Sequence, residues 1–555
     1  MYDLLIKGGR VVDGTGRARF DADVAVKDGR IAAIGADLPG EALSVVDAAG
    51  QVVAPGFIDP HTHFDVQLLW DGAAKPALEH GITSVVPGNC SLSLAPLKAK
   101  DRQALVGMFQ QIEEMPPAAF TDAFEWTWED FAGYRAALEK SLAINVAPLV
   151  GHSVIRLWVM GAEANQRAAR EGEIKAMQDL LRECLEAGAV GLSTSFVDVD
   201  EKARPVPSRF ADFAELDALA AVLGEFGRML QIVPEFYDVD LTIARIDQLA
   251  ELSLKHGIPT TFSPVFDSRF APGAAPRQLA RVEEQFARGA RVWPQMQTRP
   301  IDISFSLLRP SLFFARLPSW MRTLRQPLAE RLKALRDPAT VDRLLTDAGP
   351  DGGAAIFGTL VARGGDALPA ELAGKTVSEI ASARGETPAQ ALLNLSLENG
   401  LDVAFIAESR GHEDTGRIGP MLASPHVHIG ASDGGAHISS FATYGDTGYL
   451  FSEFVRKAGA MTLEEAVKKI TSETADIWRL KDRGVLREGF AADIVVFDPD
   501  TIARGDELPV FDMPGDGMRY VRGSVGVDTV VVNGAIAWAK GAYTDAKAGE
   551  ICGLA

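Results

Sequence analysis

Hydrophobic and polar positions alternate in short runs at both ends of the chain. Residues 1–55 contain the runs DLLIKGGRVVDG, DVAVKDGRIAAIG and SVVDAAGQVVAPG, separated by glycine-containing turns. Val and Ile favour strands, and the intervening turn residues favour hairpins. The runs ADIVVFDPD (492–500) and DTVVVNGAIAWAKGAYT (528–544) have the same character. Because the first meander is too small to be stable alone, we expect both ends to form one small β-sandwich domain.

Between these ends the pattern changes to short apolar runs separated by helix-like segments. The segment EIKAMQDLLRECLEAG (173–188), for example, has apolar residues at three- and four-residue spacing and a closing glycine. Strands that alternate with helices indicate a parallel sheet. The apolar runs are 56–59, 84–90, 144–151, 189–195, 229–235, 259–265, 291–297, 402–408 and 427–435. Nine runs are close to the eight strands of a (β/α)8 barrel, so the sequence predicts an α/β fold with a TIM-like barrel.

These patterns predict three parts along the chain. Residues 1–55 and 481–555 are expected to form the two parts of the β-sandwich, and residues 56–480 the barrel. The stretch 298–385 fits the barrel pattern poorly, since it is helix-rich and contains SFSLLRPSLFFARLPSW. We interpret it as a helical insertion over the mouth of the barrel.

Composition and charge narrow the classes of function. Hydrophobic residues make up 47% and charged residues 23% of the 555 residues, as in an ordinary globular protein. The net charge of −20 disfavours binding to nucleic acid or to an anionic membrane. No window approaches a membrane span, the start lacks the features of a signal peptide, and the three cysteines are too few for a disulfide framework. We expect a cytoplasmic protein that acts on a small molecule, and homo-oligomerisation stays open.

The stretch VAPGFIDPHTHFD (53–65) contains two of the nine histidines of the chain. His61 and His63 follow the apolar run GFID, so both are expected at the carboxyl end of a barrel strand, where active-site residues lie in this fold. Residues i and i+2 of an extended segment point to the same side. The two imidazoles can therefore face one metal ion. Taken alone, a His-x-His pair also occurs by chance.

Two further residues end apolar runs in the same way. Cys90 ends SVVPGNC and offers a thiolate, while Asp433 ends VHIGASD and offers a carboxylate that can bind metal and accept a proton. Individually, Cys90 reads as a buried small hydrophobe and Asp433 as a turn residue before two glycines. Together with His61 and His63, each at a predicted strand end, they favour a metal site.

Four other residues are candidates for binding substrate: His152, Glu235, Arg299 and His437. His152 ends the run PLVGH, and His437 lies four residues after Asp433, so both can reach the same mouth. For both we favour contact with substrate or with a ligand over direct metal binding. Arg299, in the stretch QTRP just past a predicted strand, can pair with a substrate carboxylate. An ordinary surface arginine explains it equally well.

The motifs together resemble the amidohydrolase superfamily of metal-dependent hydrolases. The similar stretches are LLIKGGRVVDGTG, APGFIDPHTHFD, SDGGAH and TSETADIWRLKDRGVLREGFAADIVVFD. PGNCS, PLVGHSVIR and GLSTS make the chain most similar to the D-aminoacylase group, the N-acyl-D-amino-acid deacylases. The resemblance implies a (β/α)8 barrel with a β-sandwich built from both ends. It also implies zinc chemistry, in which metal-activated water attacks an amide carbonyl and Asp433 transfers the proton.

One departure from this group concerns the second metal. D-aminoacylases have a histidine after the fifth strand and another after the sixth, and the corresponding stretches here, 231–238 and 260–266, contain none. Glu235 can replace one of them, and nothing obvious replaces the other. The fourth-strand runs also lack the lysine that bridges two metals in other superfamily members. We therefore expect one Zn²⁺ per chain, bound by His61, His63, Cys90 and Asp433.

Several functions fit these residues. The leading hypothesis is a hydrolase of a non-peptide C–N bond, acting on an N-acyl amino acid or a related amide. A cyclic amide or imide hydrolase and a lactone hydrolase use the same kind of site, because ester and amide cleavage pass through similar tetrahedral intermediates. A non-catalytic scaffold barrel is a further alternative, although convergent ligands have no purpose in a scaffold.

Overall fold

A computed structural model describes residues 1–269, 271–308, 311–314, 316–363, 368–408, 411–430 and 432–553. The chain forms two compact units. The first comprises Met1–Arg299, Asp414–His437 and Thr443–Ala555, and the second comprises Pro300–Glu413 and Ile438–Ala442. The insertion predicted near 298–385 overlaps the second unit.

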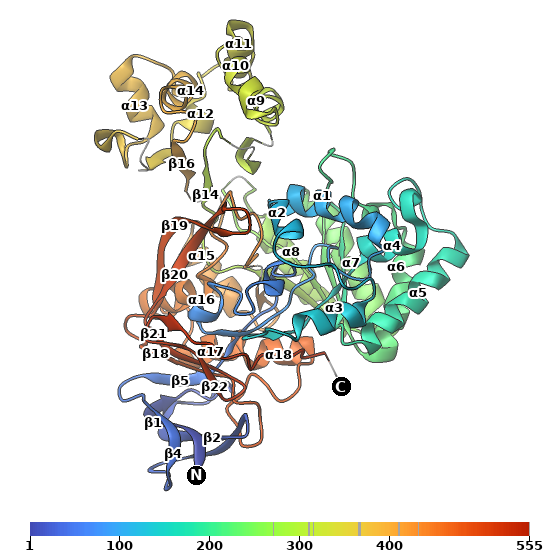
Figure 1. Cartoon of the computed structure of the whole chain (residues 1–555), viewed down its shortest axis with the longest axis vertical. Coiled ribbons are helices and arrows are strands. Elements are labelled where there is room, and N and C mark those ends of the chain that lie inside the picture. Colours follow the sequence, from blue (N-terminus) through green and yellow to red (C-terminus); the bar gives the residue numbers. More distant parts are fainter. Residues whose placement is uncertain are drawn as a thin grey trace. The chain divides into compact units, whose positions relative to one another are not determined.

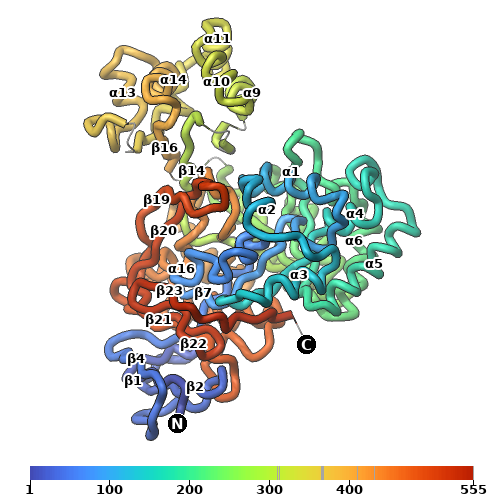
Figure 2. The backbone as a smooth tube through the Cα atoms, in the orientation of Figure 1, coloured from blue at the N-terminus to red at the C-terminus, as the bar shows by residue number. Residues whose placement is uncertain are grey.

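Strands from both ends of the chain share one nine-stranded sheet in the first unit (Figure 1). β5 (Val52–Pro55) pairs with β1 (Tyr2–Val11) and also with β18 (Ile494–Phe497), which lies more than 400 residues further along the sequence. In Figure 2 the blue N-terminal and red C-terminal segments accordingly lie side by side. The remaining strands are β2 (Phe20–Lys27), β3 (Arg30–Gly35), β4 (Ala42–Asp47), β21 (Val527–Val532), β22 (Ala535–Ala539) and β23 (Ala542–Tyr543).

A hydrophobic cluster joins the two ends of the chain. Leu4 and Ile6 of β1 and Ile494 and Val496 of β18 are buried in this one cluster. Alternate residues of a strand point to the same face, so each strand contributes every second side chain. Neither end could bury this face without the other. A separate two-stranded sheet nearby in the sequence consists of β19 (Ala503–Met513) and β20 (Gly517–Val525).

Between its N-terminal and C-terminal parts, the chain forms two parallel sheets. One has the order β6-β7-β8 and the other the order β17-β13-β12-β11-β10-β9. Their strands are β6 (Phe57–Asp59), β7 (Ile82–Val85), β8 (Asn145–Val146), β9 (Val150–Gly151), β10 (Gly191–Ser195), β11 (Met229–Val233), β12 (Thr260–Phe262), β13 (Val292–Met296) and β17 (His428–Ile429). Only residues 147–149 separate β8 from β9, and an isolated parallel bridge joins Thr62 to Gly434. Side chains that follow parallel strands lie at one edge of each sheet.

Helices connect the parallel strands and cover them. They include α1 (Arg102–Ile112), α3 (Phe131–Leu138), α4 (His152–Met160), α5 (Glu171–Glu186), α6 (Phe213–Phe226), α7 (Val239–His256) and α8 (Ala274–Ala287). Asp212 and Asp238 accept hydrogen bonds from backbone N–H groups at the starts of α6 and α7, which satisfies donors that have no partner within the helix. No helix in the described ranges is both long and apolar enough to cross a membrane.

The second unit has its own aromatic core. Its antiparallel sheet has the order β14-β16-β15, formed by β14 (Ile303–Phe305), β15 (Val361–Arg363) and β16 (Ala404–Ala407). Phe305, Phe405 and Trp320 are fully buried or nearly so in its core. Its helices are α9 (Pro318–Leu324), α10 (Leu328–Ala334), α11 (Pro338–Asp347), α12 (Ala354–Phe357), α13 (Val377–Arg384) and α14 (Pro388–Glu398).

One predicted barrel run belongs to this second unit. The apolar run 402–408 contains β16, which pairs antiparallel with β14 and β15 rather than with any strand of the parallel sheets. Its inclusion among the barrel runs is therefore wrong. The other eight runs contain or adjoin strands of the two parallel sheets.

Candidate metal centre

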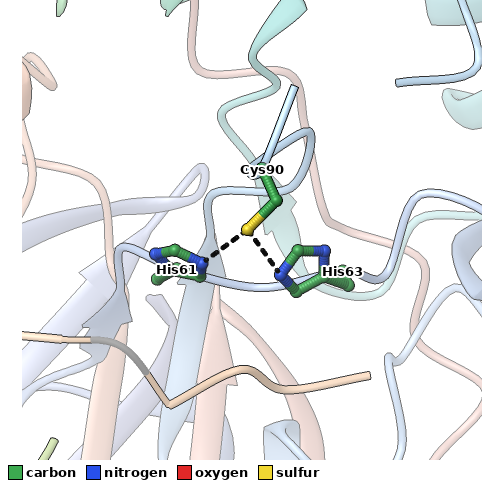
Figure 3. Close-up of side chains that lie close together, drawn as sticks. All are labelled: His61, His63 and Cys90. Atoms are coloured by element: carbon green, nitrogen blue, oxygen red, sulfur yellow. Dashed lines mark hydrogen bonds between the residues drawn. The ribbon is translucent and has the colours of Figure 1, made fainter. Parts of the chain in front are cut away.

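Two histidines directly after β6 present their Nε2 atoms to one point. His61 and His63 are both buried. His61 Nδ1 lies 2.8 Å from Gln295 Oε1, and His63 Nδ1 lies 2.9 Å from Glu113 Oε1. An imidazole that donates from Nδ1 keeps the lone pair on Nε2 available for a metal. Figure 3 shows both Nε2 atoms directed toward the sulfur of Cys90.

Cys90 follows β7 and brings its sulfur between the two imidazoles. The sulfur lies 3.6 Å from His61 Nε2 and 3.7 Å from His63 Nε2. The backbone of Cys90 has φ +54°, and Ser91 has φ +70°, in the left-handed region that non-glycine residues rarely occupy. Such strain costs about 1–3 kcal/mol per residue and is concentrated at functional sites. The turn that aims the thiol is therefore maintained against a local cost.

Asp433, which follows β17, adds a carboxylate to the same group. Its Oδ1 lies 3.3 Å from His61 Nε2 and 3.6 Å from His63 Nε2, and its side chain is 30% exposed. Its backbone also has positive φ, +59°. Burial disfavours the charge of Asp433, but the neighbouring imidazoles outweigh burial and hold its pKa below the usual range. Asp433 is therefore a carboxylate at neutral pH, with one side open to solvent.

Polar contacts tie the turn before Asp433 to the histidine segment. Ser432 Oγ donates to Asp59 Oδ2 at 2.6 Å, and His63 N donates to Gly434 O at 2.7 Å. Burial raises the pKa of Asp59 to about 7. These bonds connect the segments after β6 and β17 across the bridge between Thr62 and Gly434, which fixes the distance between the imidazoles and the carboxylate.

His61, His63 and Cys90 fit three ligand positions of a zinc ion, and Asp433 lies beside the two imidazoles. Ligand atoms of His61, His63 and Cys90 all lie within 4.8 Å of one another. Zinc–nitrogen distances of about 2.0–2.1 Å and zinc–sulfur distances of about 2.3 Å place the ligand atoms of a tetrahedral site about 3.3–3.6 Å apart. The two imidazole Nε2 atoms lie 3.6 and 3.7 Å from Cys90 Sγ and 3.3 and 3.6 Å from Asp433 Oδ1, and Asp433 lies outside the cluster of three ligand atoms. Two imidazoles, a thiolate and a carboxylate are also the donors that zinc prefers.

The ionisation of these groups depends on burial. Burial lowers the pKa of His61 to about 4, so its imidazole is neutral near pH 7, the form that binds a metal. Burial raises the pKa of the Cys90 thiol to about 12. Without a cation the sulfur therefore keeps its proton, and binding of a divalent ion must release it.

Arg299 is held inside the protein rather than presented to solvent. Its side chain is 4% exposed, and its Nε lies 2.8 Å from Asp446 Oδ2. Its Nη2 donates to Ser432 O at 2.6 Å. The guanidinium therefore supports the turn that precedes Asp433. The predicted pairing of Arg299 with a substrate carboxylate is not one of these contacts and stays a prediction.

His152 begins α4 and lies in a separate buried network. Its Nδ1 lies 3.0 Å from Thr194 Oγ1 and its Nε2 lies 2.7 Å from Glu215 Oε1. Glu215 also forms an ion pair with Arg156, and all these side chains are fully buried. Burial opposes the charge of Glu215, but bonds to His152 and Arg156 lower its pKa to about 2. Both ring nitrogens of His152 are thus occupied, and it does not join the metal-binding group.

Glu235 and His437 differ in their relation to this group. Both oxygens of Glu235 accept hydrogen bonds from Arg245, at 3.1 and 2.8 Å. Arg245 in turn lies 3.6 Å above the ring of Phe196. Glu235 is thus not among the clustered ligand atoms. His437 is close enough to Asp433 for its charge to help lower the pKa of that carboxyl.

Sequence reasoning missed two residues that contact the histidines. Gln295 lies in β13, within an apolar run that was assigned only as a strand. Glu113 directly follows α1, in the stretch QQIEEM, and its side chain is fully buried. Neither belongs to a recognisable short motif. The only signal for Gln295 was a polar residue within a buried parallel strand, and Glu113 offered none.

The sequence of this chain is similar to those of known proteins. The Amidohydro_3 family model, described as amidohydrolase family, matches residues 44–292 and 307–537. N-acyl-D-glutamate deacylase from Alcaligenes xylosoxydans xylosoxydans is 32% identical over 540 residues, which cover 96% of this chain and 93% of that protein. The residues matched by the family model include the positions of His61, His63, Cys90 and Asp433.

Solved structures share the α/β fold over nearly the whole length. N-acyl-D-glutamate deacylase from Bordetella bronchiseptica, complexed with zinc and a phosphonate inhibitor that mimics the tetrahedral intermediate, has a TM-score of 0.68 and 28% identity, covering 99% of both chains. A D-aminoacylase, described by its binuclear metal centre with one-metal activation and second-metal attenuation, has a TM-score of 0.67 and 27% identity, again covering 99% of both chains.

Proposed function

The chain belongs to the amidohydrolase family, and on this premise we propose that it is a zinc-dependent hydrolase that cleaves the amide bond of N-acyl amino acids. The observation that carries the proposal is the convergence of His61, His63 and Cys90, whose ligand atoms lie within 4.8 Å of one another, with the Asp433 carboxylate beside both imidazoles. The relatives named for deacylation of N-acyl-D-glutamate and the zinc in one solved relative support the substrate class and the ion.

Each side chain has a distinct part in this reaction. His61, His63 and Cys90 hold the ion from the buried side, which leaves the exposed side of Asp433 toward substrate. Zinc bound there supplies a Lewis acid that polarises a carbonyl and lowers the pKa of water toward about 7. The Asp433 oxygen that does not face the imidazoles would accept the proton of the attacking water and deliver it to the nitrogen that leaves. The low pKa of Asp433 keeps this carboxyl ionised at neutral pH, so that it carries no proton before the reaction.

The metal content of the purified protein is expected to be about one zinc ion per chain. Only His61, His63 and Cys90 form a cluster of at least three potential ligands among the described residues, and Glu235 is engaged by Arg245. Elemental analysis after dialysis against metal-free buffer measures the content directly. Two tightly held ions per chain would contradict the expectation and show that other groups build a second site. No bound metal, with no uptake of added Zn²⁺, would favour a non-catalytic scaffold.

The substrate class is tested with a panel of compounds. We expect the zinc-loaded protein to hydrolyse N-acyl-D-amino acids with higher kcat/KM than the matching L-compounds, cyclic imides, hydantoins or lactones. The comparison of D- and L-forms of one N-acyl amino acid controls for acyl-group preference. Preferred turnover of a cyclic imide, a hydantoin or a lactone would replace the proposed substrate while leaving the metal chemistry in place.

We further propose that the two parallel sheets form one (β/α)8 barrel, with residues 1–55 and 481–555 as a small β-sandwich and 56–480 as the barrel with its insertion. Eight strand positions support this proposal if β8 and β9 count as one interrupted strand. The parallel bridge between Thr62 and Gly434 lies where β6 and β17 would meet in a closed barrel. The barrel would bring all four proposed ligands to its carboxyl-terminal mouth.

A further inference from the structure

The two histidines of the candidate metal centre have chemically different partners on their Nδ1 atoms. His61 contacts the neutral amide oxygen of Gln295 at 2.8 Å, whereas His63 contacts the carboxylate of Glu113 at 2.9 Å. Each oxygen lies beside Nδ1, while Nε2 of the same ring faces Cys90, but only the contact of His61 with Gln295 has hydrogen-bond geometry. Glu113 therefore adds a negative charge behind one ligand only.

The position of Glu113 is unfavourable for a carboxylate unless it serves this contact. Its side chain is fully buried, and neither of its oxygens accepts a hydrogen bond from a described group, although Oε1 lies 2.9 Å from His63 Nδ1. A buried charge without partners is costly. Glu113 also directly follows the last residue of α1, where the helix dipole disfavours an anion. Both costs act against folding, and the imidazole of His63 is the one described group that offsets them.

We propose that Glu113 is a positioning residue for zinc, which fixes the Nδ1–H tautomer of His63 and strengthens its Nε2 as a metal ligand. The proposal rests on the zinc site proposed above. A carboxylate that accepts from the distal nitrogen of a ligating imidazole orients the ring and increases its basicity. Glu113 touches neither the ion nor the substrate, so its effect is expected first in the affinity for the metal and only through it in turnover.

Removal of the charge alone separates this role from a structural one. Glu113→Gln keeps the size of the side chain and an oxygen that can accept from His63 Nδ1, but it makes this contact like that of Gln295 with His61. The affinity for Zn²⁺, measured by competition with a chromogenic chelator, is expected to fall by about 10–100-fold, the usual effect of losing a partner of a metal ligand. Glu113→Ala, which also removes the acceptor, is expected to bind Zn²⁺ more weakly still.

Two further measurements keep the result interpretable. Cobalt(II) substituted for zinc reports the ligand field, so its visible absorption bands are expected to shift in Glu113→Gln relative to wild type. Thermal unfolding of the metal-free protein is expected to show no loss of stability in Glu113→Gln, because a buried charge has been removed. Asp217→Asn is a matched control, since Asp217 pairs with His256 at 2.8 Å on the helices α6 and α7, and its zinc affinity and cobalt spectrum should equal those of wild type.

The outcomes distinguish this proposal from the proposed function. Equal zinc affinity and an unchanged cobalt spectrum in Glu113→Gln, with normal zinc binding by wild type, would overturn the role of Glu113 and leave the zinc site intact. A lower melting temperature of metal-free Glu113→Gln with unchanged affinity would assign Glu113 to the fold alone. Failure of wild type itself to bind zinc would instead overturn the proposed function.

Discussion

Replacement of His61 or His63 by alanine is expected to abolish zinc binding and to lower turnover by on the order of a thousandfold or more, because unactivated water has a pKa of about 15.7 rather than about 7. Both imidazoles are more than 97% buried and direct Nε2 to the shared point beside Cys90 and Asp433. Zinc content and kcat with an N-acyl-D-amino acid measure the two effects. Retention of wild-type turnover and zinc by either variant would show that the pair is not a ligand set.

A control separates lost chemistry from lost folding. His61→Ala leaves Gln295 without its partner, which costs about 1–3 kcal/mol of stability, a loss that a chain of this size should survive. Circular dichroism and thermal unfolding of both variants check this. His256→Ala removes a histidine that also pairs with a carboxylate, Asp217, but on the outer helices. It should keep full zinc content and full turnover.

Asp433→Asn is expected to bind zinc less tightly but measurably, and to turn over roughly a hundredfold or more slowly even when the site is filled, the usual loss for a general base. Asparagine keeps the size of the side chain and one oxygen; in the wild-type carboxylate, Oδ1 lies near both imidazoles. The amide cannot accept the proton of the attacking water. Assays with zinc in excess measure chemistry separately from occupancy. Complete recovery of turnover in excess zinc would assign Asp433 to metal binding alone.

The pH profile provides an independent check of Asp433. The pKa of this carboxyl lies below its ordinary value in the folded protein, so the carboxyl is ionised between pH 5 and pH 7, and its protonation can lower turnover only at more acidic pH. Loss of activity between pH 5 and pH 7 in wild type would therefore have to come from another group or from loss of the metal.

The position of the candidate ligands could be predicted because it follows from strand ends. His61, His63, Cys90 and Asp433 each follow an apolar run, and carboxyl ends of parallel strands meet at one edge. The structure clusters the ligand atoms of His61, His63 and Cys90 and places Asp433 Oδ1 3.3 and 3.6 Å from the two imidazoles. Hydrophobic periodicity was sufficient for this, because it needed only the end of each strand and not its neighbours.

The same reasoning could not predict which strands pair with one another. The run 402–408 is as apolar as the parallel strands, and nothing within it reveals that β16 pairs antiparallel in another unit. The contacts of individual side chains could not be predicted for a similar reason. Arg299 and Glu235 were candidates for chemistry because of where they lie along the chain, but their charges are engaged by Asp446 and Arg245. Glu113 reaches His63 only because α1 packs where it does, and packing between distant segments leaves no local pattern.

The sheet shared by both ends of the chain has a consequence for the timing of biosynthesis. β5 ends at Pro55, and its partner β18 begins at Ile494. At roughly 5–20 residues per second, ribosomes need roughly 20–90 s to make the intervening chain. For that time β5 lacks one of its two neighbours, and an unpaired strand edge invites pairing with other chains. During synthesis, we therefore expect chaperones to bind this N-terminal segment in preference to other parts of the protein.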